Sequence, residues 1–227
     1  MTALRPHDPR TRVLITGFGP FPGVPVNASA RLVAALAERA TAAFPQAAFH
    51  VAVLPAEWDA SPAMLAALLA KHQPNLSLHF GVAREAKGFR IETRAANACR
   101  LTDDAAGLRP VADWIVKAGD PFRTTTLPAA AITARLTALG IPATVSDDAG
   151  GYLCNAILYH ALQHAEAAEG GVRTGFIHIP ADLSGPPLTF EQALAGALEI
   201  VRVCLAEAPP HEHAGTLRFP SPSTGRG

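Results

Sequence analysis

The chain has 227 residues, of which 49% are hydrophobic and 17% charged, and its formal net charge is zero. This composition supplies a core and lacks the charge excess of disordered chains or of proteins that bind nucleic acids or anionic membranes. The mean hydropathy is +0.18, but the apolar runs are short and interrupted, so no membrane-spanning segment is expected.

The chain begins with a polar leader, residues 1–11, which lacks the apolar core of a signal peptide. We expect this leader to be flexible. We expect one α/β domain over residues 12–208 and a fraying Pro-, Ser- and Gly-rich tail over residues 209–227. The three cysteines fit neither a disulfide framework nor a zinc motif, which indicates reduced thiols and a cytoplasmic protein.

Short apolar or alternating runs predict strands, and Ala/Leu-rich periodic segments predict helices. In chain order, the first half of the domain is expected to hold a strand over 12–16, a helix capped by Asn27 or Ser29 and ending near Ala43, a strand over 49–54, a helix that Ser61 caps and that ends near His72, and a strand over 75–80. The second half is expected to hold an irregular stretch over 84–128 with room for a hairpin, a helix over 128–139 stopped by Gly140, a strand over 143–146, a helix from Cys154 to about Glu169, a strand over 173–179 and a helix over 189–208.

Strands that alternate with amphipathic helices predict a mostly parallel sheet covered on both faces, a single-domain α/β/α sandwich. Sites in such folds lie beyond the carboxyl ends of strands. The loop with Phe18 and Phe21, the turn at Gly81, the turn before Cys154, and His178 all follow predicted strands. We therefore expect these groups to gather at one edge of the sheet.

Three of the side chains have the chemistry of a cysteine hydrolase. Cys154 follows a Gly-Gly turn and lies near the first turn of a predicted helix, where free N–H groups and the helix dipole favour a negative sulfur. His178 would act as the proton carrier, and Glu92 would orient the imidazole. Backbone N–H groups near Cys154 would hold the oxyanion.

Each residue also has a structural interpretation. A free cysteine is usually a small buried hydrophobe, and a histidine that closes an apolar strand is usually a hydrogen-bonded core residue. Glu92 stands between Arg90 and Arg94, a pattern equally typical of a solvated ion-paired surface. The residue types alone leave both interpretations open.

No other pattern predicts a metal or cofactor site. His160 and His164 lie one helical turn apart but lack a third ligand, and the histidines at 211 and 213 fall in the tail. The pair Asp103–Asp104 and the pair Asp147–Asp148 are typical of turns, and Gly17–Gly19 is too short for a dinucleotide loop.

The local sequences around these residues resemble pyroglutamyl peptidase I, the pyrrolidone-carboxylate peptidases of cysteine peptidase family C15. Four segments match the motifs of that family in order. They are residues 13–27 (VLITGFGPFPG ending in Asn), Glu92–Asn97, Ser146–Asn155 (SDDAGGYLCN), and Gly175–Pro180 (GFIHIP). The resemblance spans roughly residues 12–208.

The resemblance implies removal of an N-terminal pyroglutamyl residue from peptides, with no metal or organic cofactor. It places Cys154, Glu92 and His178 on the nucleophile, acid and base of the family, and it implies an α/β/α sandwich that commonly assembles as a homotetramer. It also places Phe18 and Phe21 on the two phenylalanines that flank the lactam ring. An aromatic slot suits this flat, uncharged ring and would make the entry of a free ammonium unfavourable.

More than one role is open for other residues of this region. Phe18 and Phe21 could equally be loop residues that pack on the core, and Asn27 could brace their loop or cap the helix. Arg100 is the counterpart of an arginine near the oxyanion in the family, but it stands two residues closer to Glu92. The Gly-Arg pair of the family is missing from residues 84–88.

Because the rim over residues 84–107 is altered, three functions stay open. The first is the pyroglutamyl exopeptidase. The second is a weak or silent homologue that binds a cyclic acyl group, and the third is a related amide hydrolase with a different substrate range.

Overall fold

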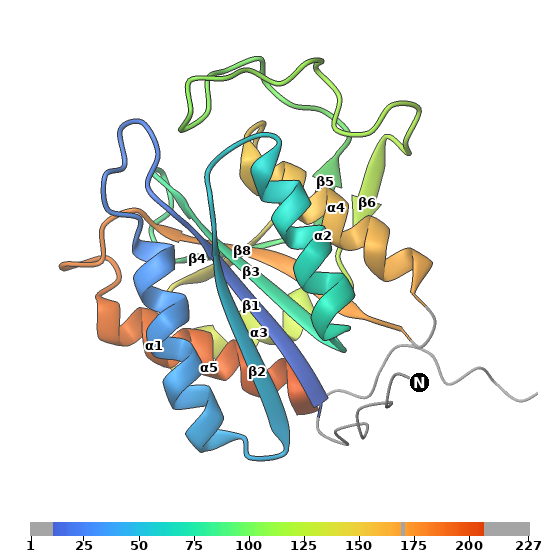
Figure 1. Ribbon diagram of the computed structural model, residues 1–227. Coiled ribbons are helices and arrows are strands. Elements are labelled where there is room, and N and C mark those ends of the chain that lie inside the picture. The colour runs from blue at the N-terminus through green and yellow to red at the C-terminus, as the bar shows by residue number, and fades with distance from the viewer. Residues whose placement is uncertain (1–10, 169–170, 207–227) are drawn as a thin grey trace, which may run out of the picture.

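The computed structural model describes residues 11–168 and 171–206 and forms an α/β/α sandwich (Figure 1). The strands are β1 (Thr11–Phe18), β2 (Ala47–Leu54), β3 (Leu76–Ala83), β4 (Phe89–Glu92), β5 (Arg94–Ala96), β6 (Phe122–Thr124), β7 (Ala143–Ser146) and β8 (Arg173–Pro180). The helices are α1 (Ala28–Ala43), α2 (Ala60–His72), α3 (Ala129–Ala138), α4 (Leu153–Ala167) and α5 (Phe190–Ala206). None of the helices in these ranges is long and apolar enough to cross a bilayer.

Six strands form the central sheet in the order β2-β1-β3-β8-β4-β7. The first four are mutually parallel, which confirms the predicted mostly parallel sheet. Strand β4 is antiparallel to β8, and β7 is parallel to β4, so one edge of the sheet is reversed. Strand β8 is buried along its whole length because helices cover both faces, which explains its nearly continuous apolar sequence.

The segment 84–128, expected to be irregular, contains three strands. Strand β4 was not predicted, since its four residues pair only with the distant strands β8 and β7. Strands β5 and β6 form an antiparallel pair, but residues 97–121 separate them, so the pair is not the hairpin for which the sequence left room. The side chain of Asn97 holds the long loop between these two strands in place. Its Oδ1 accepts the N–H groups of Ile115 and Val116, and its Nδ2 donates to the carbonyls of Val116 and Gly119.

The helix ends mostly follow the predicted signals. Asn27 caps α1, since its Oδ1 accepts the N–H of Ser29 at 3.1 Å. Gly140 follows α3 with a φ of +71°, a conformation that suits glycine at the end of a helix. The prediction that Ser61 caps α2 is wrong: the helix begins at Ala60, and the Ser61 hydroxyl donates to the carbonyl of Pro55. Residues 1–10, 169–170 and 207–227, which include most of the leader and the tail, lie outside the described residues.

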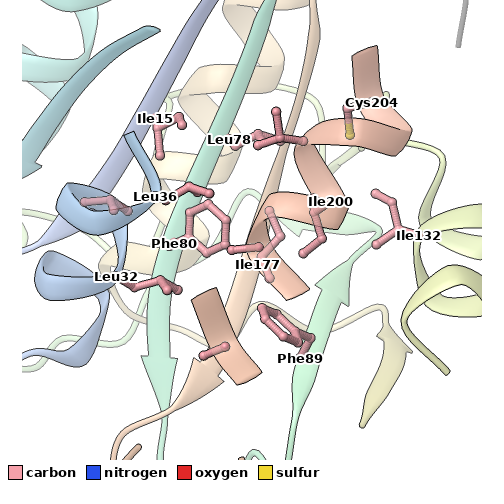
Figure 2. Packing of buried hydrophobic residues seen from close by; sticks show 14 of the residues in the cluster. Ile15, Leu32, Leu36, Leu78, Phe80, Phe89, Ile132, Ile177, Ile200 and Cys204 are labelled. Atoms are coloured by element: carbon pink, nitrogen blue, oxygen red, sulfur yellow. The ribbon is translucent and has the colours of Figure 1, made fainter. Parts of the chain in front are cut away.

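The sheet separates two hydrophobic clusters. Helices α1, α3 and α5 cover one face, where Leu36, Phe80, Ile177 and Ile200 are fully buried (Figure 2). Helices α2 and α4 cover the other face. Alternation along each strand sends neighbouring residues to opposite faces, so His178, next to Ile177, points toward the α2/α4 side.

A polar layer lies within the α2/α4 face. His79 on β3 is fully buried, and its Nδ1 lies 2.8 Å from the Thr16 hydroxyl on β1. The Ser77 hydroxyl donates to Thr174 on β8 at 2.6 Å. Burial lowers the pKa of His79 to about 3, so the ring is neutral at physiological pH. These bonds join the three central strands directly beneath the edge where the predicted site residues lie.

Asn155, the residue after the predicted nucleophile, attaches α4 to the segment after β4. Its Oδ1 accepts the N–H of Ala96 at 2.9 Å, and its Nδ2 donates to the carbonyls of Ala96 and Ala98 at 2.8 and 2.9 Å. The side chain is 1% exposed, so water cannot replace these bonds without rearrangement.

Replacing Asn155 by Ala removes three part-buried hydrogen bonds to the backbone of Ala96 and Ala98. We expect the free energy of unfolding to fall by about 2–4 kcal/mol, measured by urea denaturation. Thr137→Ala, which removes an exposed polar side chain from α3, is the matched control and should change it by less than about 0.5 kcal/mol. Equal stability of the two variants would contradict this role of Asn155.

Candidate active site

The predicted acid and base meet across two neighbouring strands. Because β4 is antiparallel to β8, Arg90 lies opposite His178 and Glu92 lies opposite Phe176. The Glu92 and His178 side chains therefore share one face, and the Nδ1 of His178 donates to the Oε1 of Glu92 at 2.7 Å. Glu92 is 0% exposed and His178 is 5% exposed. This bond fixes the orientation of the ring and leaves Nε2 free to act on another group.

Glu92 does not belong to a solvated surface, so that alternative is wrong. The ion pair that this alternative included is present, however. The Nε of Arg90 lies 3.6 Å from the Oε1 of Glu92 and partly neutralises the buried charge. Arg94 instead pairs with Asp147. The other carboxylate oxygen of Glu92, Oε2, is buried without a hydrogen-bond partner among the described residues.

Cys154 is the second residue of α4, close to the predicted first turn. Tyr152 is the N-cap and provides no side-chain hydrogen bond, so the first N–H groups of the helix have no side-chain acceptor from their cap. Cys154 is partly exposed, whereas Cys99 and Cys204 are buried. It is therefore the only one of the three thiols that is not the buried hydrophobe of the structural interpretation.

The sulfur of Cys154 lies against the backbone of β3. A Cβ atom built on Gly81 would lie 3.0 Å from Sγ and only 2.7 Å from the Cζ of Phe176. Any side chain at position 81 would force the thiol or the buried phenylalanine to move. The absence of a side chain here lets the nucleophile approach the strand that runs beside β8 and His178.

Two opposing effects set the protonation of His178. Burial disfavours the charged ring, but the Coulombic attraction and hydrogen bond of Cys154, followed by those of Glu92, outweigh it and raise the pKa of His178 to about 9. At neutral pH the ring is therefore an imidazolium, held between a sulfur and a carboxylate. A cysteine peptidase needs this state before the leaving group is protonated.

A cavity of about 420 Å³ opens above these groups. Its wall brings together the predicted binding residues with two of the predicted catalytic residues, namely Phe18, Phe21, Asn27, Arg100, Cys154 and His178. Glu92 lies behind His178 and does not line the cavity. A volume of this size is within the range of small-molecule sites.

Aromatic rings form one side of the cavity. The Phe18 ring packs 6.3 Å from Phe176, and the Phe21 ring packs 5.9 Å from Tyr152. Trp58 supports Tyr152 edge-on at 5.2 Å. Phe18 and Phe21 thus pack on neighbouring rings and also line the cavity. Neither Tyr152 nor Trp58 was predicted as a site residue, although Tyr152 stands in the cysteine motif.

Asn27 has both of the roles that the sequence left open, the helix cap and the support of the loop with Phe18 and Phe21. Besides capping α1, it donates from Nδ2 to the carbonyl of Gly19 at 2.9 Å. The side chain is 4% exposed, so it braces the loop between Phe18 and Phe21 from below. The position of the aromatic wall is thereby coupled to the start of α1.

Arg100 reaches the cavity from the remodelled segment. The backbone N–H of Arg100 donates to the backbone carbonyl of Gly151 at 2.8 Å. The side chain lies against the same residue, since a Cβ built on Gly151 would lie 2.7 Å from the Cγ of Arg100. The arginine therefore lies on the turn that leads into α4. Arg84, Arg90 and Asp148 also line the cavity, and none of them was predicted as a site residue.

The aspartate pairs behave as turn formers. Asp104 accepts the N–H groups of Trp58, Ala106 and Leu108 at 2.8–2.9 Å, and these bonds lower its pKa despite partial desolvation. Asp148 accepts the N–H of Gly150 at 2.8 Å. Within the described ranges, no group of three or more His, Cys, Asp or Glu residues is arranged to hold a metal.

Comparison with known proteins agrees with this geometry. A sequence model of the family described as pyroglutamyl peptidase matches residues 11–195. The chain belongs to the pyroglutamyl peptidase family. Pyrrolidone-carboxylate peptidases similar to it include that of Gloeobacter violaceus, 39% identical over 74% of this chain and 81% of the relative. The one from Vibrio vulnificus (strain YJ016) is 34% identical over 90% of this chain and 97% of the relative.

Solved structures of pyroglutamyl peptidases share the fold. A mutant pyrrolidone carboxyl peptidase from Pyrococcus furiosus has a TM-score of 0.79 at 28% identity, covering 86% of this chain and 98% of that one. Pyroglutamyl peptidase I from Bacillus amyloliquefaciens has a TM-score of 0.77 at 29% identity, covering 87% and 98%. The sandwich predicted from the sequence is therefore the fold of this family.

The contact between Gly81 and Cys154 can be tested with Gly81→Ala. We expect iodoacetamide to alkylate the Cys154 thiol at least tenfold more slowly, because displacement of a reacting group by about 1 Å can cost 100-fold in rate. Alkylation followed by peptide mass spectrometry gives the rate at this cysteine. Gly185→Ala, where a Cβ would meet open space, is the control. Unchanged alkylation in folded Gly81→Ala would show that the close approach is not required.

Proposed function

We propose that this pyroglutamyl peptidase family member is a cysteine exopeptidase that removes the pyroglutamyl residue from the N-terminus of peptides. The observation that supports this most strongly is the convergence of Cys154, His178 and Glu92 at an aromatic-walled cavity. In this proposal Phe18 and Phe21 hold the flat lactam ring. The uncharged wall makes the burial of a free N-terminal ammonium unfavourable, so ordinary peptides are rejected.

The reaction proceeds through a thioester. The thiolate of Cys154 attacks the pyroglutamyl carbonyl, and the resulting oxyanion is held by N–H groups at the start of α4. His178 gives its proton to the amine as the carbon–nitrogen bond breaks, which leaves the acyl group on sulfur. His178, now neutral, then takes a proton from water, and the hydroxide attacks the thioester. The carbon–sulfur bond breaks, and pyroglutamate and the thiolate are released.

Glu92 acts through His178 rather than on the substrate. Its hydrogen bond to Nδ1 holds the ring so that Nε2 faces the sulfur, and its charge stabilises the imidazolium. Arg90 limits the penalty of burying this carboxylate, because it lies within ion-pair distance of the same oxygen. We also propose a reducing, cytoplasmic setting, which suits three cysteines that form no disulfide. A homo-oligomer stays a prediction from the resemblance, and sedimentation of the native protein tests it.

Turnover of pyroglutamyl-naphthylamide tests the proposed function directly. We expect hydrolysis that iodoacetamide abolishes and that Cys154→Ser reduces by at least about 1,000-fold, since a serine lacks the activated sulfur. Cys99→Ser is the matched control, because its hydroxyl can still donate to the carbonyl of Ala112. Full activity of Cys154→Ser would refute the mechanism. Binding of the cyclic acyl group without turnover would favour the silent homologue, and turnover of other amides alone would favour the related hydrolase.

The raised pKa of His178 predicts the alkaline side of the pH profile. Because the imidazolium must protonate the leaving amine, kcat/KM should be lost as the pH rises through about 9. Glu92→Gln removes the carboxylate charge that helps to raise the pKa of His178, although the amide oxygen can still accept the ring N–H, so this loss should occur at lower pH. Glu85→Gln, on the exposed loop after β3, should leave the profile in place. An identical alkaline limb in Glu92→Gln and wild type would contradict the assigned role of Glu92.

A further inference from the structure

The cavity carries more positive than negative charge along its wall. Three arginines line it, Arg84, Arg90 and Arg100, together with a single exposed carboxylate, Asp148. Arg90 is already engaged: it lies 3.6 Å from Glu92, and its Nη2 donates to the Ser146 hydroxyl and to the carbonyl of Asp148. The charges of Arg84 and Arg100 remain to be explained.

Arg84 and Arg100 reach the cavity from two different walls. Arg84 follows β3 and extends toward the loop after β1, since a Cβ built on Gly23 would lie 2.5 Å from its Nη2. Arg100 lies on Gly151, in the turn before α4. Both are exposed, and neither forms an ion pair with a carboxylate of the described residues.

The acyl half of the proposed substrate does not account for these charges. A pyroglutamyl group has no ionised atom, and its ring is assigned to the wall with Phe18 and Phe21. The peptide beyond the scissile bond must occupy the rest of the cavity, whose wall includes the exposed Arg84 and Arg100. Apart from the transient oxyanion, which the N–H groups at the start of α4 hold, the negative charge nearest the scissile bond is a carboxylate of the leaving residue, and guanidinium groups recognise carboxylates well.

We propose that Arg84 and Arg100 form an anion subsite that selects pyroglutamyl substrates whose leaving residue carries a carboxylate. The carboxylate belongs either to the C-terminus of a pyroglutamyl dipeptide or to an acidic side chain at the second residue. This inference rests on the proposed function and adds the substrate class on the leaving side. In this proposal the exposed rim of the cavity, with Arg84 and Arg100, determines substrate preference. The reacting groups, Cys154 and His178, lie on the cavity floor.

The test compares kcat/KM for two matched pairs of substrates. One pair is pyroglutamyl-alanine and its C-terminal amide, and the other is pyroglutamyl-glutamate amide and pyroglutamyl-glutamine amide. At low ionic strength we expect the carboxylate to be preferred in at least one pair, by roughly two- to fivefold for each guanidinium, as for other exposed charge pairs. The pair that shows the preference identifies the source of the carboxylate.

Arg84→Gln and Arg100→Gln should each reduce this preference, and the double variant should abolish it, as should high salt. Lys87→Gln is the matched control, because it removes an exposed charge from the same loop without lining this cavity. Equal kcat/KM within both wild-type pairs, or a preference that survives in the double variant, would overturn the subsite. Absence of turnover on every substrate, pyroglutamyl-naphthylamide included, would overturn the proposed function and the subsite with it.

Discussion

The hydrogen bond between the buried Glu92 and His178 is the constraint on which the site depends. A carboxylate that is 0% exposed is stable only beside groups that compensate its charge, and here a ring N–H and the nearby guanidinium of Arg90 do so. The register of β4 on β8 produces this arrangement, because it places Arg90 opposite His178 and Glu92 opposite Phe176, so that Arg90, Glu92 and His178 share one face. Strand β4, at the reversed edge of the sheet, therefore carries the carboxylate that orients His178.

Close packing against β3 brings the nucleophile to this pair, and its hydrogen bond with His178 completes the contact. Gly81 leaves room for the sulfur of Cys154 and for the ring of Phe176, while Asn155 fastens the same turn of α4 to the segment after β4. Both devices position the backbone to within a fraction of an ångström, because protein interiors are dense and deform little. A catalytic thiol on a helix start needs this support, since its reach depends on one rotatable bond.

The floor and the rim of the cavity obey different physical rules. The floor is buried, so charges there must be paired and sterics are strict. The rim is exposed, where a change of charge has a small effect on stability and a larger effect on which ligand is preferred. This difference is consistent with a chain only 28–29% identical to solved pyroglutamyl peptidases that keeps their fold, since exposed residues such as Arg84 and Arg100 tolerate changes of charge that the buried Glu92 does not.

Much of the fold followed from local sequence alone. The apolar runs of β1, β3 and β8, the Asn27 cap and the Gly140 stop are set by residues close in the chain, because solvent exclusion and capping act locally. The three reacting residues, Cys154, His178 and Glu92, were also predicted from their local motifs. The short β4, its direction, the burial of Glu92 and the raised pKa of His178 were not, since β4 pairs with strands more than fifty residues away and the pKa depends on Cys154 and Glu92 both meeting His178 in space. The position of Arg84 in the cavity wall and the need for a glycine at position 81 could not be predicted either. Both depend on segments that are distant in the sequence and pack together only in the folded chain.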